Sequence, residues 1–160
     1  MLNYCISIKN YWLGMINSTA SLGKKMIKGS CTCGAVEFHI FGELTDVSFC
    51  HCSICRKVSG SAFASYGSTP IGKFEWVEGK AIPRKYKFSN EVTKFFCSHC
   101  GSTLATHHSA EPTWYHISLG CIDGSPSITP KYHQYVGSKP SWSTISDGLL
   151  KYESWPDGEL

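Results

Sequence analysis

The stretch around which the chain is organised reads Cys50-His51-Cys52-Ser53-Ile54-Cys55-Arg56-Lys57. Its three cysteines follow a C-x-C-x2-C spacing, so one backbone turn can bring their sulfur atoms to a single metal ion. Zinc takes four tetrahedral ligands, with thiolate sulfurs at about 2.3 Å. Three thiolates therefore leave one coordination position open, which is a property of catalytic rather than structural zinc sites.

Two further cysteine pairs flank this stretch, Cys31-Thr32-Cys33 and Cys97-Ser98-His99-Cys100. Together they offer four sulfurs, enough to close a second, structural metal site. The chain has nine cysteines, and a secreted protein with so many would be expected to form disulfides. Cysteines this close together pair poorly with one another and are better placed to share a metal. Thiolate ligation also implies a reducing compartment.

The composition fits one compact domain. Of 160 residues, 42% are hydrophobic and 13% aromatic, which is enough for a core. The net charge is only +3, and no Lys/Arg run is interleaved with aromatic residues, so nucleic acid is not an expected partner. No stretch reaches the roughly 18 apolar residues that a membrane span needs, so no membrane association is expected.

Short alternating segments predict the fold class. In residues 35–40, Val36, Phe38 and Ile40 alternate in the strand period and share one face. Further strand-like segments are residues 45–49, 62–66, 74–77, 84–88, 92–96, 103–106, 114–119 and 132–136. Residues 53–59 could form one helical turn that ends at Gly60, and residues 142–152 are expected to wrap back as a tail. Many short strands with frequent Gly and Pro predict a mainly β fold of antiparallel strands.

The N-terminal region differs from the rest of the chain. Residues 1–25 lie outside every cysteine group and precede the first acidic residue, Glu37. They resemble a weak transit peptide, but the favoured interpretation is either a disordered extension or an upstream start codon, with Met26 as the natural start. The predicted organisation is therefore an extension over 1–25, a metal-binding domain over 26–156 and a tail over 157–160.

Residues 1–25 are predicted to be dispensable, because they lack both cysteine groups and alternating strand patterns. A chain that starts at Met26 should keep the metal content and the thermal midpoint of the full chain. Elemental analysis and thermal melting of the two purified proteins compare them directly. A midpoint lowered by more than a few degrees would show that the extension packs against the domain.

The cysteine groups, with their flanking residues, resemble a known family. Residues 29–36, 50–57 and 97–102 look like the motifs of the glutathione-dependent formaldehyde-activating enzymes, a family that includes centromere-protein-V-like domains. The C-terminal segments 120–123, 130–133, 139–142 and 147–148 agree with it. The resemblance covers roughly residues 26–156 and implies a β-tent fold that holds two zinc ions.

The resemblance also implies roles for the cysteines. Cys31, Cys33, Cys97 and Cys100 match the family's structural zinc site. A second set matches the catalytic zinc site, namely Cys50, Cys52 and Cys55. The implied activity is that of a carbon–sulfur lyase, which joins formaldehyde to the thiol of glutathione or reverses that step. The expected partners are thus a small thiol such as glutathione and a small aldehyde. The expected compartment is the cytoplasm or, if residues 1–25 are a transit peptide, the mitochondrion. A homo-oligomer is possible.

The residues themselves indicate part of this chemistry. A zinc ion with three thiolates carries a net charge of about −1, so Arg56 and Lys57 are candidates to neutralise it or to contact substrate; a solvated helix end is the alternative. The metal could hold a substrate thiol as a nucleophilic thiolate, or polarise a carbonyl oxygen instead. His51 and His99 are interpreted as loop histidines, and His133 as a core or surface residue rather than a cavity residue.

Two other functions compete with the lyase. In the first, both zinc ions only shape a binding or scaffold module of the centromere-protein-V-like type, which would require a large basic or apolar partner surface. In the second, the chain is a methionine-R-sulfoxide reductase, a related fold that needs a nucleophilic cysteine in an Arg-x-Cys-x-Asn setting. Cys121 lies instead in Leu119-Gly120-Cys121-Ile122-Asp123, and we interpret it as a small core residue.

Overall fold

The computed structural model describes residues 25–77 and 80–156, and its strands form two sheets. The smaller sheet has the order β1-β2-β5, with β1 at Met26–Ser30, β2 at Glu37–Phe41 and β5 at Phe74–Trp76. The larger sheet contains, in spatial order, β11 (Leu150–Lys151), β10 (Tyr132–Gln134), β3 (Thr45–Cys50), β4 (Ala64–Pro70), β9 (Trp114–Ser118), β8 (Thr103–His108), β7 (Val92–Phe96) and β6 (Arg84–Lys87). This confirms the expected mainly β fold of the β-tent type.

The helices of the described residues are short. The one α-helix, α1, spans Ser53–Ser59 and ends at Gly60, as the sequence predicted. Three 3-10 turns cover Ile71–Lys73, Leu119–Cys121 and Val136–Ser138. Within residues 25–77 and 80–156, none of the helices has the length and apolar character needed to cross a membrane.

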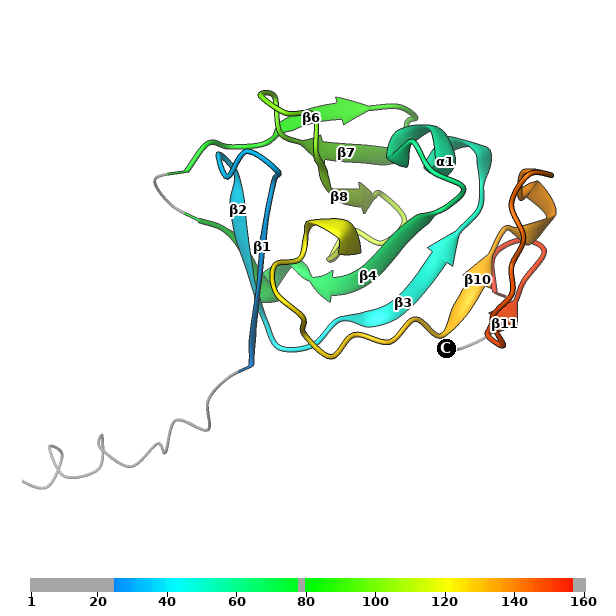
Figure 1. The fold of residues 1–160 in the computed structure, drawn as a ribbon. Helices are drawn as coiled ribbons and strands as arrows, with labels where there is room; N and C mark the ends of the chain where they lie inside the picture. The colour runs from blue at the N-terminus through cyan, green and yellow to red at the C-terminus, as the bar shows by residue number, and fades with distance from the viewer. Residues whose placement is uncertain (1–24, 78–79, 157–160) are drawn as a thin grey trace, which may run out of the picture.

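The hydrophobic core lies between the two sheets. From β2, Phe38 and Ile40 are fully buried, and from the larger sheet they face Leu104, Ala105 and Ile117, which are buried as well. Figure 1 shows β1 and β2 beside the larger sheet, which curves from β6 round to β10 and β11. The strand-period alternation predicted for residues 35–40 therefore buries one face of β2, as expected.

The opposite face of the larger sheet is polar. In the register of neighbouring strands, Ser68 lies beside His116, and His116 lies beside Thr106. These positions alternate with core positions such as Ala105 and Ile117. The strands thus present apolar side chains to the core and polar side chains to a concave face, where the candidate site lies.

Some details of the predicted topology change. Strand β1 was not predicted. It pairs with β2 in an antiparallel register that places Gly29 beside Phe38. Only a glycine fits there, because a Cβ atom would come within 2.1 Å of the Phe38 ring. Strand β10 ends at Gln134, and it pairs in parallel with both β3 and β11, in an otherwise antiparallel pattern. The strand-like segments around Gly79 and Pro83 enter different sheets, as β5 and β6. The predictions for residues 1–24 lie outside the described residues.

Candidate metal centres

The first cysteine cluster joins two turns that are distant in sequence. The sulfur atoms of Cys31, Cys33, Cys97 and Cys100 all lie within 4.8 Å of one another. Sγ of Cys33 is 3.5 Å from Sγ of Cys31 and 3.8 Å from Sγ of Cys97. A tetrahedron of sulfurs at about 2.3 Å from zinc has edges of about 3.8 Å. The donor set and its spacing therefore fit a tetrahedral thiolate-bound metal.

Glycines at positive φ shape both turns of this cluster. Gly34 has φ 71° and its N–H donates to the Cys31 carbonyl, at 2.9 Å. Gly101 has φ 78° and makes the same contact with the Cys97 carbonyl, also at 2.9 Å. A residue with a Cβ atom would be strained there, so the glycine after each pair lets the backbone fold back and present its sulfurs.

The second cluster is built from one local segment. Cys50 ends β3, Cys52 is the N-cap of α1, and Cys55 lies in the first turn of that helix. The Cys52 sulfur accepts a hydrogen bond from the Cys55 N–H at 3.3 Å, which fixes the turn. All three sulfur atoms lie within 4.8 Å of one another, as the spacing predicted.

The charges in this cluster favour a bound cation. Hydrogen bonds with the Cys50 and Cys55 thiols lower the pKa of Cys52 to about 2. The hydrogen bond with Cys52 raises the pKa of Cys50 to about 12, and the hydrogen bond with Cys50 raises the pKa of Cys55. One thiolate at this spacing therefore opposes ionisation of its neighbours, and a cation among the sulfurs lets all three ionise together.

The two clusters differ in what they face. A cavity of about 810 Å³ lies over the concave face of the larger sheet. Cys50, Cys52 and Cys55 all line this cavity. None of the four cysteines of the first cluster lines this cavity. The three-sulfur cluster is therefore accessible to a small molecule, whereas the four-sulfur cluster holds two turns together.

Two metal ions per chain are expected, because the clusters divide the grouped cysteines into a set of four and a set of three. Elemental analysis of protein purified without chelator, and reconstituted with zinc, should give two equivalents. Cys50, Cys52 and Cys55 should then be protected from alkylation. One equivalent, with these three thiols alkylated at full rate, would contradict an occupied three-sulfur site.

A buried chain of polar groups positions the three-cysteine loop. His51 is fully buried, and its Nε2 lies 2.8 Å from Nδ1 of His133. Nε2 of His133 lies 3.0 Å from both carboxylate oxygens of Asp147. Because the carboxylate accepts, His133 donates through Nε2 and accepts at Nδ1, so that His51 donates to it. His51 is therefore more than a loop histidine. Of the two placements expected for His133, core or surface, the structure shows the core.

The remaining predicted residues lie outside the cavity wall. Arg56 donates through Nε to the carbonyl of His51, at 3.1 Å, and through its guanidinium to the carbonyl of Ser138. Lys57 is exposed, and neither residue is among those that line the cavity. Their role in neutralising charge or contacting substrate stays a prediction.

The other two residues interpreted from the sequence lie away from the three-sulfur cluster. His99 is exposed in its turn. The half-buried Cys121 packs against the core, and its Sγ donates to the Thr103 carbonyl.

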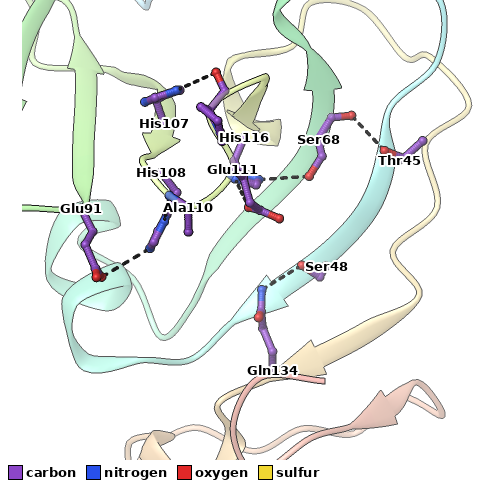
Figure 2. A network of polar contacts seen from close by, with 11 residues as sticks. Thr45, Ser48, Ser68, Glu91, His107, His108, Ala110, Glu111, His116 and Gln134 are labelled. Atoms are coloured by element: carbon purple, nitrogen blue, oxygen red, sulfur yellow. Dashed lines mark hydrogen bonds and ion pairs between the residues drawn. The ribbon is translucent and has the colours of Figure 1, made fainter. Parts of the chain in front are cut away.

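A second polar network, missed by the sequence interpretation, lies on the cavity wall (Figure 2). His116 contacts Ser68 Oγ through Nδ1, at 3.0 Å, and Glu111 through Nε2, at 2.9 Å. All three residues line the cavity. They come from β4, β9 and the turn before β9, so no local spacing in the sequence links them.

Burial of His116 makes stability depend on pH. Burial lowers its pKa, and the Glu111 charge opposes the shift only in part. Because the folded pKa is below the unfolded value of about 6.5, the stabilising effect is complete above that pH and is lost as pH falls towards the folded pKa. Just below pH 6.5 the free energy of unfolding should fall by up to about 1.4 kcal/mol per pH unit.

Denaturant unfolding of the metal-loaded protein at pH 7.5 and pH 5.5 measures this fall. His116→Gln should flatten the dependence, and the exposed His99→Gln is the control. An unchanged slope in His116→Gln would contradict the assignment.

Comparison with known proteins gives relatives of similar size. The family model of the glutathione-dependent formaldehyde-activating enzyme matches residues 26–138. A Halomonas elongata protein, provisionally described as such an enzyme, is 28% identical over 127 residues, which cover 75% of this chain and 81% of that one. A Schizosaccharomyces pombe protein, described as an uncharacterized lyase, is 27% identical over 113 residues, 71% of this chain and 80% of that one.

A solved structure shares the fold. The crystal structure of a Rhodobacter sphaeroides protein matches with a TM-score of 0.52 and 27% identity, over 62% of this chain and 91% of that chain. The family model covers most of the described residues, including all the cysteines of both clusters. The chain therefore belongs to the family of glutathione-dependent formaldehyde-activating enzymes.

Proposed function

We propose that the protein is a zinc-dependent carbon–sulfur lyase that joins formaldehyde, or a related small carbonyl compound, to a thiol such as glutathione, or reverses that step. The observation that carries the proposal is the position of Cys50, Cys52 and Cys55 on the wall of a cavity of about 810 Å³. A three-sulfur cluster that faces a cavity suits an open catalytic metal position. Family membership and the lyase description of a relative support the same reaction class.

In the proposed reaction a carbon–sulfur bond forms and the carbonyl π bond breaks. The thiol loses its proton, the sulfur attacks the carbonyl carbon, and the oxygen gains a proton to give the hydroxymethyl thioether. No electrons are gained or lost overall. Zinc, when bound at the three sulfurs, supplies Lewis acidity, which stabilises either the thiolate or the polarised carbonyl oxygen.

The chain's own residues orient the reactants in this proposal. The buried contact between His51 and His133 holds the loop between Cys50 and Cys52. Tyr66 lines the cavity, where burial, with the nearby Cys55 as a further cause, raises the pKa of its hydroxyl. Tyr66 therefore stays protonated at neutral pH and can donate a hydrogen bond to the carbonyl oxygen. Since the ligands must be thiolates, we place the protein in a reducing compartment such as the cytoplasm.

The test is turnover by the metal-loaded full chain. Formaldehyde and glutathione should reach equilibrium with S-hydroxymethylglutathione faster with the protein than without it. Removal of the metal by a chelator should abolish the acceleration, and zinc should restore it. A rate no faster than the uncatalysed one, at full metal occupancy, would refute the proposed reaction for this thiol and this aldehyde.

A further inference from the structure

The cluster of Ser68, His116 and Glu111 on the cavity wall offers a ligand only hydrogen-bond acceptors. Burial lowers the pKa of His116, so at neutral pH this residue is uncharged. The Glu111 carboxylate accepts from His116 Nε2, at 2.9 Å, which leaves Nδ1 as an acceptor. Ser68 must then donate its hydroxyl proton to Nδ1, at 3.0 Å. Only the lone pairs of Ser68 Oγ and of the carboxylate remain for a ligand (Figure 2).

Gln134 adds a buried acceptor without a partner. Its side chain lines the cavity and is 6% exposed. Nε2 donates to Ser48 Oγ at 3.2 Å, whereas Oε1 has no partner within the described residues. Leaving a buried acceptor unpaired is unfavourable, so this oxygen suits a ligand that brings an N–H donor. In the sheet register Gln134 lies beside Cys50, near the sulfur cluster.

Asp46 brings a second carboxylate to the same wall. It lines the cavity at a bulge between Thr45 and Ser48, with the positive φ of 45° that residues other than Gly seldom adopt. Its charge and that of Glu111 both act on Tyr132, whose pKa is raised first by burial. The two carboxylates therefore lie near the same side chains.

Lysine and arginine side chains are missing from the described wall, and its two histidines, His108 and His116, already contact Glu91 and Glu111. Among the described residues that line the cavity there is no lysine or arginine. Lys94 lies beside Thr106 in the register, but its Nζ is 5.5 Å from the centre of the Phe96 ring, and the residue does not line the cavity. The aromatic side chains of Tyr135 and Trp155 line the cavity as well, and their rings also attract cations.

From these contacts we propose that the thiol substrate carries an ammonium group, which Glu111 and Asp46 bind, and an amide N–H, which Gln134 binds. This inference rests on the proposed function, because it names the thiol of that reaction. Asp46 precedes Cys50 by four strand residues, a distance of about 13 Å at 3.3 Å per residue. An aminoacyl thiol spans about 7–10 Å, and the side chains of Asp46 and Cys50, which both line the cavity, account for the rest. Carboxylates on the thiol find no lysine or arginine among the described residues that line the cavity.

The test measures binding of three thiols with the same tripeptide backbone to the metal-loaded full chain, without formaldehyde, by titration calorimetry. Glutathione dimethyl ester keeps the ammonium group and masks both carboxylates. N-acetylglutathione removes the ammonium charge and keeps both carboxylates, and glutathione has all three groups. We expect the ester to bind at least as tightly as glutathione, and N-acetylglutathione to bind tenfold or more weakly than glutathione.

Glu111→Gln should remove the preference for the ammonium group. Asp46→Asn provides a second variant with the same expectation, and asparagine tolerates the positive φ at this position. The control is Glu91→Gln, because the Glu91 carboxylate lies 3.8 Å from Nε2 of His108 but, unlike His108, Glu91 does not line the cavity. Glu91→Gln should keep the preference.

The proposal is overturned if N-acetylglutathione binds as tightly as glutathione, if the ester binds tenfold more weakly than glutathione, or if none of the three binds. Formation of the hydroxymethyl product with the same thiols separates this result from the proposed function. A retained binding preference without turnover would refute the proposed reaction and support the proposed binding site. Turnover that is faster with N-acetylglutathione than with glutathione would refute the proposed binding site and support the proposed reaction.

Discussion

Cys97→Ser is expected to unfold the chain. Cys97 is 1% exposed and lies at the turn between β7 and β8, and its sulfur lies 3.8 Å from that of Cys33, 64 residues earlier. A closed four-thiolate zinc site contributes on the order of 10 kcal/mol or more of apparent binding free energy, which exists only in the folded chain. A domain of this size has about 5–15 kcal/mol of net stability, so loss of one ligand removes most of it.

Circular dichroism and thermal melting of purified Cys97→Ser measure this effect. The control is Cys121→Ser, a half-buried cysteine outside both clusters, whose hydrogen bond to the Thr103 carbonyl a serine can also make. Cys121→Ser should keep the β-type spectrum and melt within a few degrees of the native protein. If Cys97→Ser did the same, the four-sulfur cluster would not hold the two turns together.

The parts of the molecule that local spacing determines could be predicted from the sequence. Local spacing identified the three-cysteine cluster and each of the two cysteine pairs, because a turn of two to four residues brings its own sulfurs together wherever it lies in the fold. That the two pairs meet, across 64 residues, followed instead from the four sulfurs a closed site needs and from the family resemblance. The alternation of Val36, Phe38 and Ile40 likewise identified the buried face of β2, since the side-chain period of a strand is local. Gly60 identified the end of α1 for the same reason.

The parts that could not be predicted depend on pairing between distant segments. The contact between His51 and His133 spans 82 residues, and that between Ser68 and His116 spans 48. A lone histidine in the sequence carries no spacing that reveals such a partner. The parallel pairing of β10 with β3 creates the first contact, and the antiparallel register of β4 with β9 creates the second. The residues of the cavity wall could therefore be identified only from the strand order of the folded chain.

Cys55→Ser is expected to leave the fold intact and to abolish turnover. Cys50, Cys52 and Cys55 belong to one short segment, so a metal there closes only a local loop and contributes little to holding distant strands together. Loss of a metal ligand should lower the rate by at least about a hundredfold, since removal of a residue that only orients a ligand already costs about 10–100-fold. The thermal midpoint should fall by only a few degrees.

The comparison of Cys55→Ser with Cys97→Ser decides between an enzyme and a scaffold. Both variants replace one sulfur of a cluster, and circular dichroism, metal content and turnover can be measured on both. Ser53→Ala, an exposed change in the same helical turn that does not touch the cavity wall, controls for local effects on α1. If Cys55→Ser unfolded as thoroughly as Cys97→Ser, the three-sulfur cluster would be structural too. Its metal would then be needed to keep the chain folded, and not only to offer an open coordination position. The non-catalytic binding module would in that case explain the two clusters better than the lyase does.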